Sequence, residues 1–169
     1  MPGIQFLLPK APQLPERLFE RINPASRLAI ISCTNRIYDA LQCMDAAIVT
    51  SGTSTLEAAL FEVPMAVVYR TSWPTYLAAK LVVRVPHVGM VNLIAQDAVA
   101  PEFIQHRASP TKIGKAIVEL LRDETRNAQM REHLRDVREQ LGPPGAVDRA
   151  AHAILEELRI SPQFTVNSP

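Results

Sequence analysis

Short apolar runs alternate with amphipathic segments along most of this chain. Runs of four or five mostly apolar residues are typical of buried strands, whereas apolar residues at intervals of three and four are typical of helices. Strands that alternate with helices in this way form parallel sheets. We therefore expect an α/β, Rossmann-like fold, a parallel sheet with helices on both faces. The predicted strands cover residues 4–8 (ended by Pro9), 28–32, 46–49 and 65–69, and the predicted helices cover residues 16–22, 38–44 and 56–60 and a segment that starts at Trp73.

The chain becomes helical after Ser109, a plausible N-cap residue. Two apolar stripes then recur at helical spacing, and a Gly-Pro-Pro-Gly break separates them from one further helix. We expect one α/β domain over residues 1–145, a C-terminal helix over 146–160 and a frayed tail over 161–169. The stripes are Ile113, Ile117, Leu120 and Leu121, then Met130, Leu134, Val137 and Leu141.

Charge is informative locally rather than globally. The 169 residues include 18 basic and 17 acidic ones, so a nucleic-acid partner is not expected. Residues 63–96 contain no Asp or Glu but include Arg70, Lys80 and Arg84. Such a segment suits a diphosphate, a phosphorylated lipid or an anionic membrane surface. The alternative is that Lys80 and Arg84, four residues apart, form the solvated face of a helix.

Cysteine and histidine usage argues against a metal site. Cys33 and Cys43 show neither a CxxC motif nor ligand spacing, and we expect two reduced structural thiols. The four histidines are scattered, without an HExxH motif or an acidic partner at ligand spacing. No export signal or run of ~20 apolar residues is present, which predicts a cytoplasmic protein.

The most informative stretch follows the third predicted strand. It is a hydroxyl-rich turn over residues 50–55 that contains Gly52, with Glu57 one helical turn further on. Unpaired N–H groups at the start of a helix attract anions, and a carboxylate accepts hydrogen bonds from sugar hydroxyls. The turn therefore predicts a nucleotide or sugar-phosphate site. The alternative is an ordinary N-cap, since T-S-T-L-E contains a capping box.

A longer pattern favours the binding site. S-G-T-S-T-L-E-A-A-L followed by V-P-M-A-V-V-Y-R closely resembles the lipid-A-disaccharide synthase family of inverting GT-B glycosyltransferases. The likeness continues through T-Y-L-A-A-K-L-V-V-R-V-P-H-V-G-M-V-N-L-I-A to A-P-E-F-I-Q and covers residues 40–107 most strongly. It implies a metal-independent reaction without a cofactor, because the UDP-sugar is a substrate. The implied UDP-sugar-binding residues are Ser51, Gly52, Thr53, Ser54 and Thr55 at the diphosphate, Glu57 at the ribose, Arg70 at phosphate, and Asn92, for which a turn role is the alternative.

The implied reaction transfers 2,3-diacylglucosamine from its UDP ester to 2,3-diacylglucosamine 1-phosphate, forming lipid A disaccharide and releasing UDP. Family members carry the acceptor site and the acid-base residues on an amino-terminal domain that is not found here, so the catalytic residues stay unknown. The resemblance thus makes residues 1–145 a truncated nucleotide-sugar-binding domain. In the family the last helix crosses toward the other domain, so Ala150, Ile154 and Leu158 are expected to be partly uncovered. We expect this chain alone to be inactive, to expose a sheet edge, and, as a cytoplasmic protein, to act peripherally at the inner membrane. Gln96-Asp97 departs from the family pattern.

Two alternatives remain open. The chain can be a non-catalytic UDP- or UDP-sugar-binding module, or a half-enzyme, that acts with a separate partner chain supplying the missing domain; the partner considered besides this missing half is a second copy of the chain, in a homodimer. It can also be a related UDP-sugar enzyme such as an epimerase.

Overall fold

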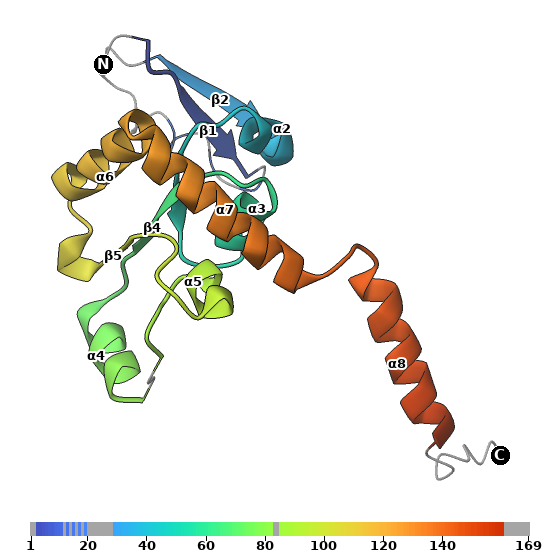
Figure 1. Cartoon of the computed structure of the whole chain (residues 1–169). Coiled ribbons are helices and arrows are strands. Elements are labelled where there is room, and N and C mark those ends of the chain that lie inside the picture. The colour runs from blue at the N-terminus through green and yellow to red at the C-terminus, as the bar shows by residue number, and fades with distance from the viewer. Residues whose placement is uncertain are drawn as a thin grey trace. The chain divides into compact units, whose positions relative to one another are not determined.

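The computed structural model describes residues 3–11, 29–82 and 85–160, together with Gln13, Pro15, Arg17 and Phe19 (Figure 1). The molecule divides into two compact units, Met1–Arg138 and Glu139–Pro169, and each is described by itself. Most of the predicted helix over residues 16–22, and the predicted tail over 161–169, lie outside the described residues. None of the described helices is both long and apolar enough to cross a bilayer.

All strand pairs in the described part of the chain are parallel, which confirms the predicted α/β class. The strands form two sheets rather than one, because no pairing links β1 or β2 to β3 among the described residues. The first sheet has the order β1-β2 and the second β3-β4-β5. The strands are β1 (Phe6–Lys10), β2 (Ile30–Thr34), β3 (Ala47–Thr50), β4 (Met65–Tyr69) and β5 (Glu102–Ile104).

Helices connect the strands, as predicted, and a helical region follows the last one. Helix α3 contacts β3, and α6 contacts both β3 and β4. The Ser109 hydroxyl caps α6 by accepting a hydrogen bond from the Lys112 N–H, which confirms the predicted cap. The helices are α2 (Ile37–Gln42), α3 (Ser54–Leu60), α4 (Trp73–Val82), α5 (Met90–Ala95), the 3-10 helix η1 (Gln105–Arg107), α6 (Pro110–Arg122), α7 (Glu124–Leu141) and α8 (Ala146–Ile160).

Of the four predicted strands, only β4 has the predicted bounds: β1 and β2 lie two residues further along the chain than predicted, and β3 lies one residue further. The first strand does not end at Pro9: β1 runs to Lys10, with Pro9 level with Cys33 of β2. Within the described chain β1 pairs only with β2, and an edge strand tolerates proline because one side needs no ladder hydrogen bonds. The second strand begins two residues later than expected, at Ile30. Neither strand β5 nor helix α5 was predicted.

The core is built around β4. Its first three residues, Met65, Ala66 and Val67, are almost completely buried, as expected of a central parallel strand. Leu120 of α6 and Met130, Leu134 and Val137 of α7 are buried in this core, and Ile117 packs against it, which confirms the predicted stripes at these positions. The other predicted members, Ile113, Leu121 and Leu141, are only half-buried. The Met130 sulfur also accepts a hydrogen bond from the Met65 N–H, at 3.3 Å between N and Sδ.

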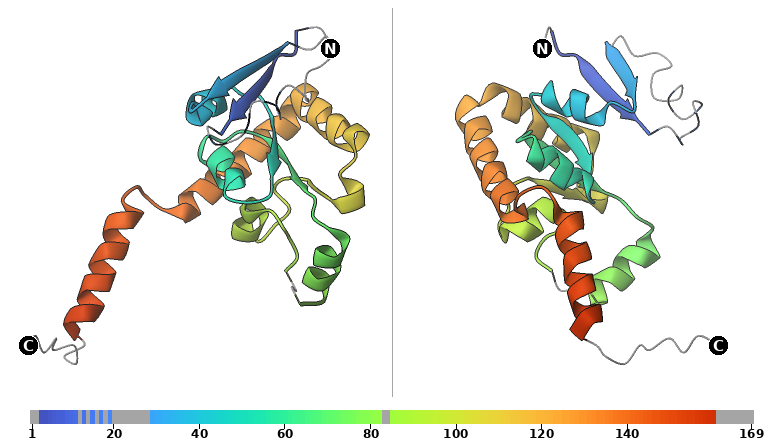
Figure 2. Two further views of the ribbon diagram at one scale, coloured as in Figure 1. Left: turned by 180° about the vertical axis from the view of Figure 1, so that it is seen from behind. Right: turned by 90° about the vertical axis from the view of Figure 1, so that its right-hand side faces the viewer.

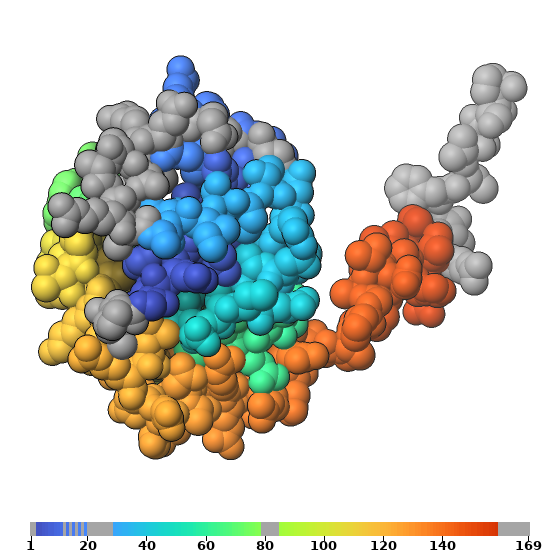
Figure 3. All heavy atoms as spheres, turned by 90° about the horizontal axis from the view of Figure 1, so that it is seen from above, coloured from blue at the N-terminus to red at the C-terminus, as the bar shows by residue number. Residues whose placement is uncertain are grey.

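The β1–β2 sheet and strand β3 leave apolar side chains exposed. Both views in Figure 2 show β1 and β2 side by side with α2 next to them, and Figure 3 shows their atoms (blue to cyan) gathered on one face. Ile48 of β3 is 59% exposed, and Phe6 and Ile31 are also exposed. Strand β3 pairs on one side only, with β4, so its other edge is open in the described structure. An open sheet edge was expected.

The turn between α3 and β4 is tied to α7 by charge. Glu62, which has a positive φ of 53°, accepts hydrogen bonds on its carbonyl from Arg131 and on its carboxylate from Arg135 and Arg138. Of the two ion pairs of Glu62, the shorter joins Arg135 Nη2 to Glu62 Oε2 at 2.9 Å. The hydrogen bond from Arg135, together with the charges of both arginines, lowers the pKa of Glu62 below its ordinary value of 4.5.

We expect Glu62→Gln to lower the free energy of unfolding by about 1 kcal/mol at neutral pH, since partly exposed ion pairs contribute little. A lowered pKa stabilises the folded state above the ordinary value of 4.5, and this contribution is lost as the pH falls through the lowered pKa. Urea unfolding from neutral pH downward should therefore show the two proteins converging in acid. The matched control Glu132→Gln changes an exposed glutamate of α7 that has no described partner, and it should have no effect. A pH-independent difference would contradict this account.

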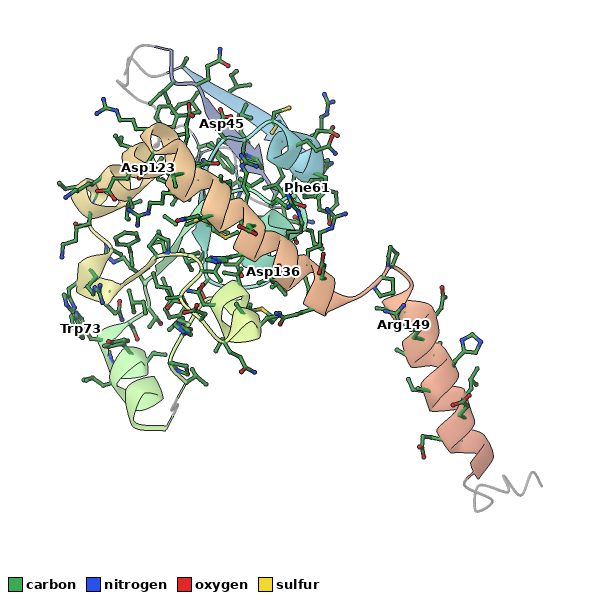
Figure 4. The ribbon with its side chains drawn as sticks, in the orientation of Figure 1. Asp45, Phe61, Trp73, Asp123, Asp136 and Arg149 are labelled. Atoms are coloured by element: carbon green, nitrogen blue, oxygen red, sulfur yellow. The ribbon has the colours of Figure 1, made fainter. Side chains whose placement is uncertain are left out.

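The second unit contains α8, whose predicted residues 146–160 are those observed. Arg149 donates hydrogen bonds to the carbonyls of Pro143 and Pro144, which closes the turn before the helix (Figure 4). Ile154, Leu155 and Leu158 are exposed within the described residues. The helix therefore has an apolar side that its own unit does not cover.

Candidate nucleotide-sugar site

Three parallel strands direct their following residues to one edge of the second sheet. Ser51 follows β3, Arg70 follows β4 and Gln105 follows β5. Pairing continues one residue beyond β3, since the Ser51 N–H donates to the Val68 carbonyl at 3.0 Å. Ligands of open α/β sheets bind outside the carboxyl ends of the strands, so this edge is the expected place for a site.

The turn from Ser51 to Ser54 presents backbone N–H groups. Gly52 has φ of 149°, a conformation that residues with a side chain rarely adopt, and an added Cβ would meet no atom within 4 Å. Among the described residues, no protein group accepts a hydrogen bond from the N–H groups of Gly52, Thr53 or Ser54. Thr53 is the N-cap residue of α3, but its side chain makes no capping hydrogen bond. The N-cap alternative is therefore wrong: Thr53 has helical dihedral angles, and Ser54, which a capping box with Glu57 would use as its cap, is already the first residue of α3.

Four of the predicted site residues have side chains without a described protein partner. Thr53 and Ser54 are exposed on the turn, and Glu57 is half-buried on α3. Arg70 is exposed directly after β4, and its guanidinium makes no described hydrogen bond or ion pair. Two hydroxyls, one carboxylate and one cation are thus available around the same sheet edge.

Two other predicted residues use their hydroxyls inside the protein. The Ser51 hydroxyl donates to the Val88 carbonyl at 2.8 Å and ties the turn to the segment before α5. Thr55 is completely buried, and its hydroxyl donates to the Gly52 carbonyl at 2.7 Å. As placed here, Thr55 supports the shape of the turn, and ligand binding through either hydroxyl stays a prediction.

Asn92 lies in a helix rather than in the loop or turn that we expected. It is in α5 and its side chain is 0% exposed. Its amide nitrogen donates to the Ala100 carbonyl at 2.8 Å and to Glu102 Oε1 at 2.9 Å, while its amide oxygen accepts from the Ala100 N–H at 2.8 Å. These contacts lock α5 to the start of β5. A contact between Asn92 and a ligand stays a prediction.

Glu102 was not singled out from the sequence. Its carboxylate accepts hydrogen bonds from the Val88 and Gly89 N–H groups, with shortest N to O distances of 3.0 and 2.8 Å, and from Asn92. A side chain at Gly89 would place its Cβ 3.1 Å from Glu102 Oε1 and 3.3 Å from Val67, so this position requires a small residue. Glu102 thereby holds the segment that receives the Ser51 hydroxyl.

Gln105 was also missed, although it lies in the A-P-E-F-I-Q segment. Its side-chain amide pairs with the peptide groups of Thr71: the Thr71 N–H donates to Oε1 at 3.3 Å, and Nε2 donates to the Thr71 carbonyl at 3.0 Å. These contacts join the ends of β4 and β5 beside Arg70. A signal that could have indicated this role is a polar residue directly after a strand, at the edge where the other candidates lie.

The available groups suit a phosphorylated sugar nucleotide. Unpaired N–H groups and a guanidinium attract phosphate oxygens, and a carboxylate accepts hydrogen bonds from neighbouring ribose hydroxyls. A shallow hollow of about 830 Å³ lies elsewhere, at α6 and α7, and none of the predicted site residues lines it. Its walls include both acidic and basic groups, such as Glu119 and Arg126, which form an ion pair at 2.8 Å. The candidate site is therefore assigned to the sheet edge on its chemistry.

Comparison with known proteins identifies the family. The lipid-A-disaccharide synthetase family profile matches residues 1–156. Proteins named lipid-A-disaccharide synthase are similar to this chain: that of Syntrophus aciditrophicus is 40% identical over 149 residues, covering 88% of this chain and 39% of the relative. The proteins of Geobacter metallireducens (40% identical, 93% and 41% covered) and Trichlorobacter lovleyi (41% identical, 92% and 40% covered) give similar values. The chain thus spans about two-fifths of the length of these relatives, and it belongs to the lipid-A-disaccharide synthetase family.

Proposed function

We propose that this chain is the UDP-sugar-binding part of a lipid-A-disaccharide synthase. The reaction of the whole enzyme would transfer 2,3-diacylglucosamine from its UDP ester to 2,3-diacylglucosamine 1-phosphate and release UDP. The observation that carries the proposal is the match of nearly the whole chain to this family. The free N–H groups of the Gly52 turn and the unpaired Arg70 guanidinium support the assignment of the donor site.

In this proposal the chain binds the donor and assists departure of UDP. As the glycosidic bond to the diphosphate breaks, negative charge grows on the leaving phosphate oxygens. The N–H groups of Gly52, Thr53 and Ser54 and the Arg70 guanidinium stabilise that charge, and Glu57 accepts hydrogen bonds from the ribose. The acceptor site and the acid-base residues are supplied by a part of the enzyme that this chain does not contain.

We expect the purified chain to bind UDP with a dissociation constant between roughly 1 µM and 1 mM, the usual range for enzyme substrates. Glu57→Ala should weaken binding about tenfold, because it removes an ionised acceptor for ribose hydroxyls. Isothermal titration calorimetry measures both values. Glu132→Ala, which removes an exposed glutamate of α7, is the matched control and should bind UDP like the wild type. Absence of binding by a folded wild-type chain would contradict the proposed donor site.

We also propose that α4 contacts the membrane that carries the lipid substrates. Trp73 of this helix, labelled in Figure 4, is 59% exposed. Leu77, one turn further on, is also exposed. Exposed tryptophan and leucine side chains favour the membrane interface. The sequence predicts that Lys80 and Arg84 add positive charge to this part of the chain, but their side chains lie outside those that the structure describes.

Cosedimentation with phosphatidylethanolamine–phosphatidylglycerol vesicles tests this contact. The double variant Trp73→Ala/Leu77→Ala should lose most of its vesicle binding, because it removes the exposed apolar groups of α4. Tyr38→Ala, which removes an exposed aromatic ring from α2, should not. Equal binding by all three proteins would show that α4 is not the contact.

A further inference from the structure

Gln105 combines three unusual features at the edge of the sheet. It is a polar residue with only 6% of its surface exposed. Its backbone φ is 50°, in the left-handed region that residues other than glycine seldom occupy. It also directly follows β5. The last residue of β5, Ile104, is level with Tyr69 of β4, and Tyr69 is the residue before Arg70. Backbone strain of this kind persists only where surrounding contacts enforce it, and it is often found at functional sites.

The contacts that hold Gln105 in this backbone conformation are made to Thr71, the residue next to Arg70. Both polar atoms of the Gln105 amide are used, Oε1 by the Thr71 N–H and Nε2 by the Thr71 carbonyl. The two hydrogen bonds fix the peptide groups on either side of the Thr71 Cα, the first of which is shared with Arg70. Arg70 itself is exposed and makes no described side-chain contact that would hold it in place. Its backbone is therefore the part of this residue that the fold controls.

We infer that Gln105 is a positioning residue for the donor site: it holds the Arg70–Thr71 peptide so that the Arg70 guanidinium reaches the phosphates of the bound nucleoside diphosphate. This inference rests on the proposed function and deepens it. Gln105 does not touch the ligand. Its effect on binding passes through Arg70, so removing Arg70 abolishes the contribution of Gln105.

A purely structural role for Gln105 makes a different prediction. If the amide served only to anchor η1, its loss would destabilise the protein, but UDP affinity would change equally whether Arg70 was present or not. A double-mutant cycle separates the two roles, because coupling appears only between groups that act together.

The test measures UDP affinity by calorimetry for the wild type, Gln105→Met, Arg70→Ala and the double variant. Methionine keeps the length of the side chain and removes both hydrogen bonds to Thr71. We expect Gln105→Met and Arg70→Ala each to weaken binding about tenfold, the usual effect of losing a charge-assisted hydrogen bond. The double variant should bind no more weakly than Arg70→Ala alone. Faster amide exchange at Thr71 in Gln105→Met, followed by NMR, checks that the hydrogen bond to Thr71 N–H has been lost.

Asn127→Leu is the matched control. Asn127 donates a hydrogen bond from its side-chain amide to the Leu120 carbonyl at 2.9 Å, in a part of the fold that contains no candidate site residue. Its loss should lower stability but leave UDP affinity unchanged. If wild-type binding is normal and Gln105→Met binds equally well, or if the two single effects multiply in the double variant, the inference is overturned and the proposed function stands. If the folded wild-type chain binds no UDP, the proposed function fails and the inference falls with it.

Discussion

Asn92→Leu is expected to lower the free energy of unfolding by about 3 kcal/mol, since each buried polar group left without a partner costs about 1–3 kcal/mol. Leucine has a similar size but forms none of the three hydrogen bonds that Asn92 makes. The Ala100 N–H and carbonyl would lose their side-chain partner, and the Glu102 carboxylate would lose one donor. Urea unfolding at neutral pH measures the change.

Asn127→Leu provides the comparison for this substitution. Asn127 is only partly buried: its amide nitrogen donates to the Leu120 carbonyl and its amide oxygen accepts from Arg131, and because water reaches this site the loss should cost about 1 kcal/mol. Asn92→Asp should be as harmful as Asn92→Leu, because it places a second carboxylate beside Glu102 at a completely buried position. A loss at Asn92 no larger than that at Asn127 would contradict the conclusion that Asn92 locks α5 to β5.

Leu134→Ala should destabilise the protein by about 3 kcal/mol, within the range measured for buried leucines. Leu134 is 0% exposed and lies in the α7 stripe packed in the core with Leu120 and Val137. The substitution removes apolar contacts and leaves a cavity that the tightly packed surroundings fill only in part. Thermal unfolding should show a midpoint lower by roughly 10 °C for a protein of this size.

Leu158→Ala is the matched control, because it is the same chemical change at a position in α8 that is 60% exposed within the described structure. Its effect on unfolding should stay within about 0.5 kcal/mol. A large effect at Leu158 would show that α8 is covered in solution, and a small effect at Leu134 would contradict the core described here.

The sequence predicts the elements that local patterns determine. Strand β4 has the predicted bounds, Met65–Tyr69, because a fully apolar run is delimited by Pro64 and Arg70. The α7 stripe of Met130, Leu134 and Val137 is predicted by helical spacing alone. Pro9 shows the limit of such reasoning: whether proline ends a strand depends on whether that strand lies at an edge, which the local sequence does not record.

The candidate site was predictable in its chemistry but not in its contacts. The hydroxyls, glycine, carboxylate and arginine of the turn region were identified by type and spacing. Residue type alone does not show which groups are available to a ligand. The hydroxyls of Ser51 and Thr55 donate hydrogen bonds to backbone carbonyls of the protein itself. Glu102 and Gln105 were missed because the partners of Glu102 lie 10 to 14 residues away and that of Gln105 lies 34 residues away in the sequence, and only the folded chain brings them together.

The central claim is that the edge formed by the ends of β3, β4 and β5 binds the UDP portion of the donor. The most direct measurement is a UDP titration of the isotope-labelled chain, followed residue by residue through its backbone amide NMR signals. The account predicts saturable shifts centred on Gly52, Thr53, Ser54 and the Arg70–Thr71 segment. Shifts centred instead on the α6–α7 hollow around Arg122 and Arg126, or no shifts in a folded chain, would contradict it.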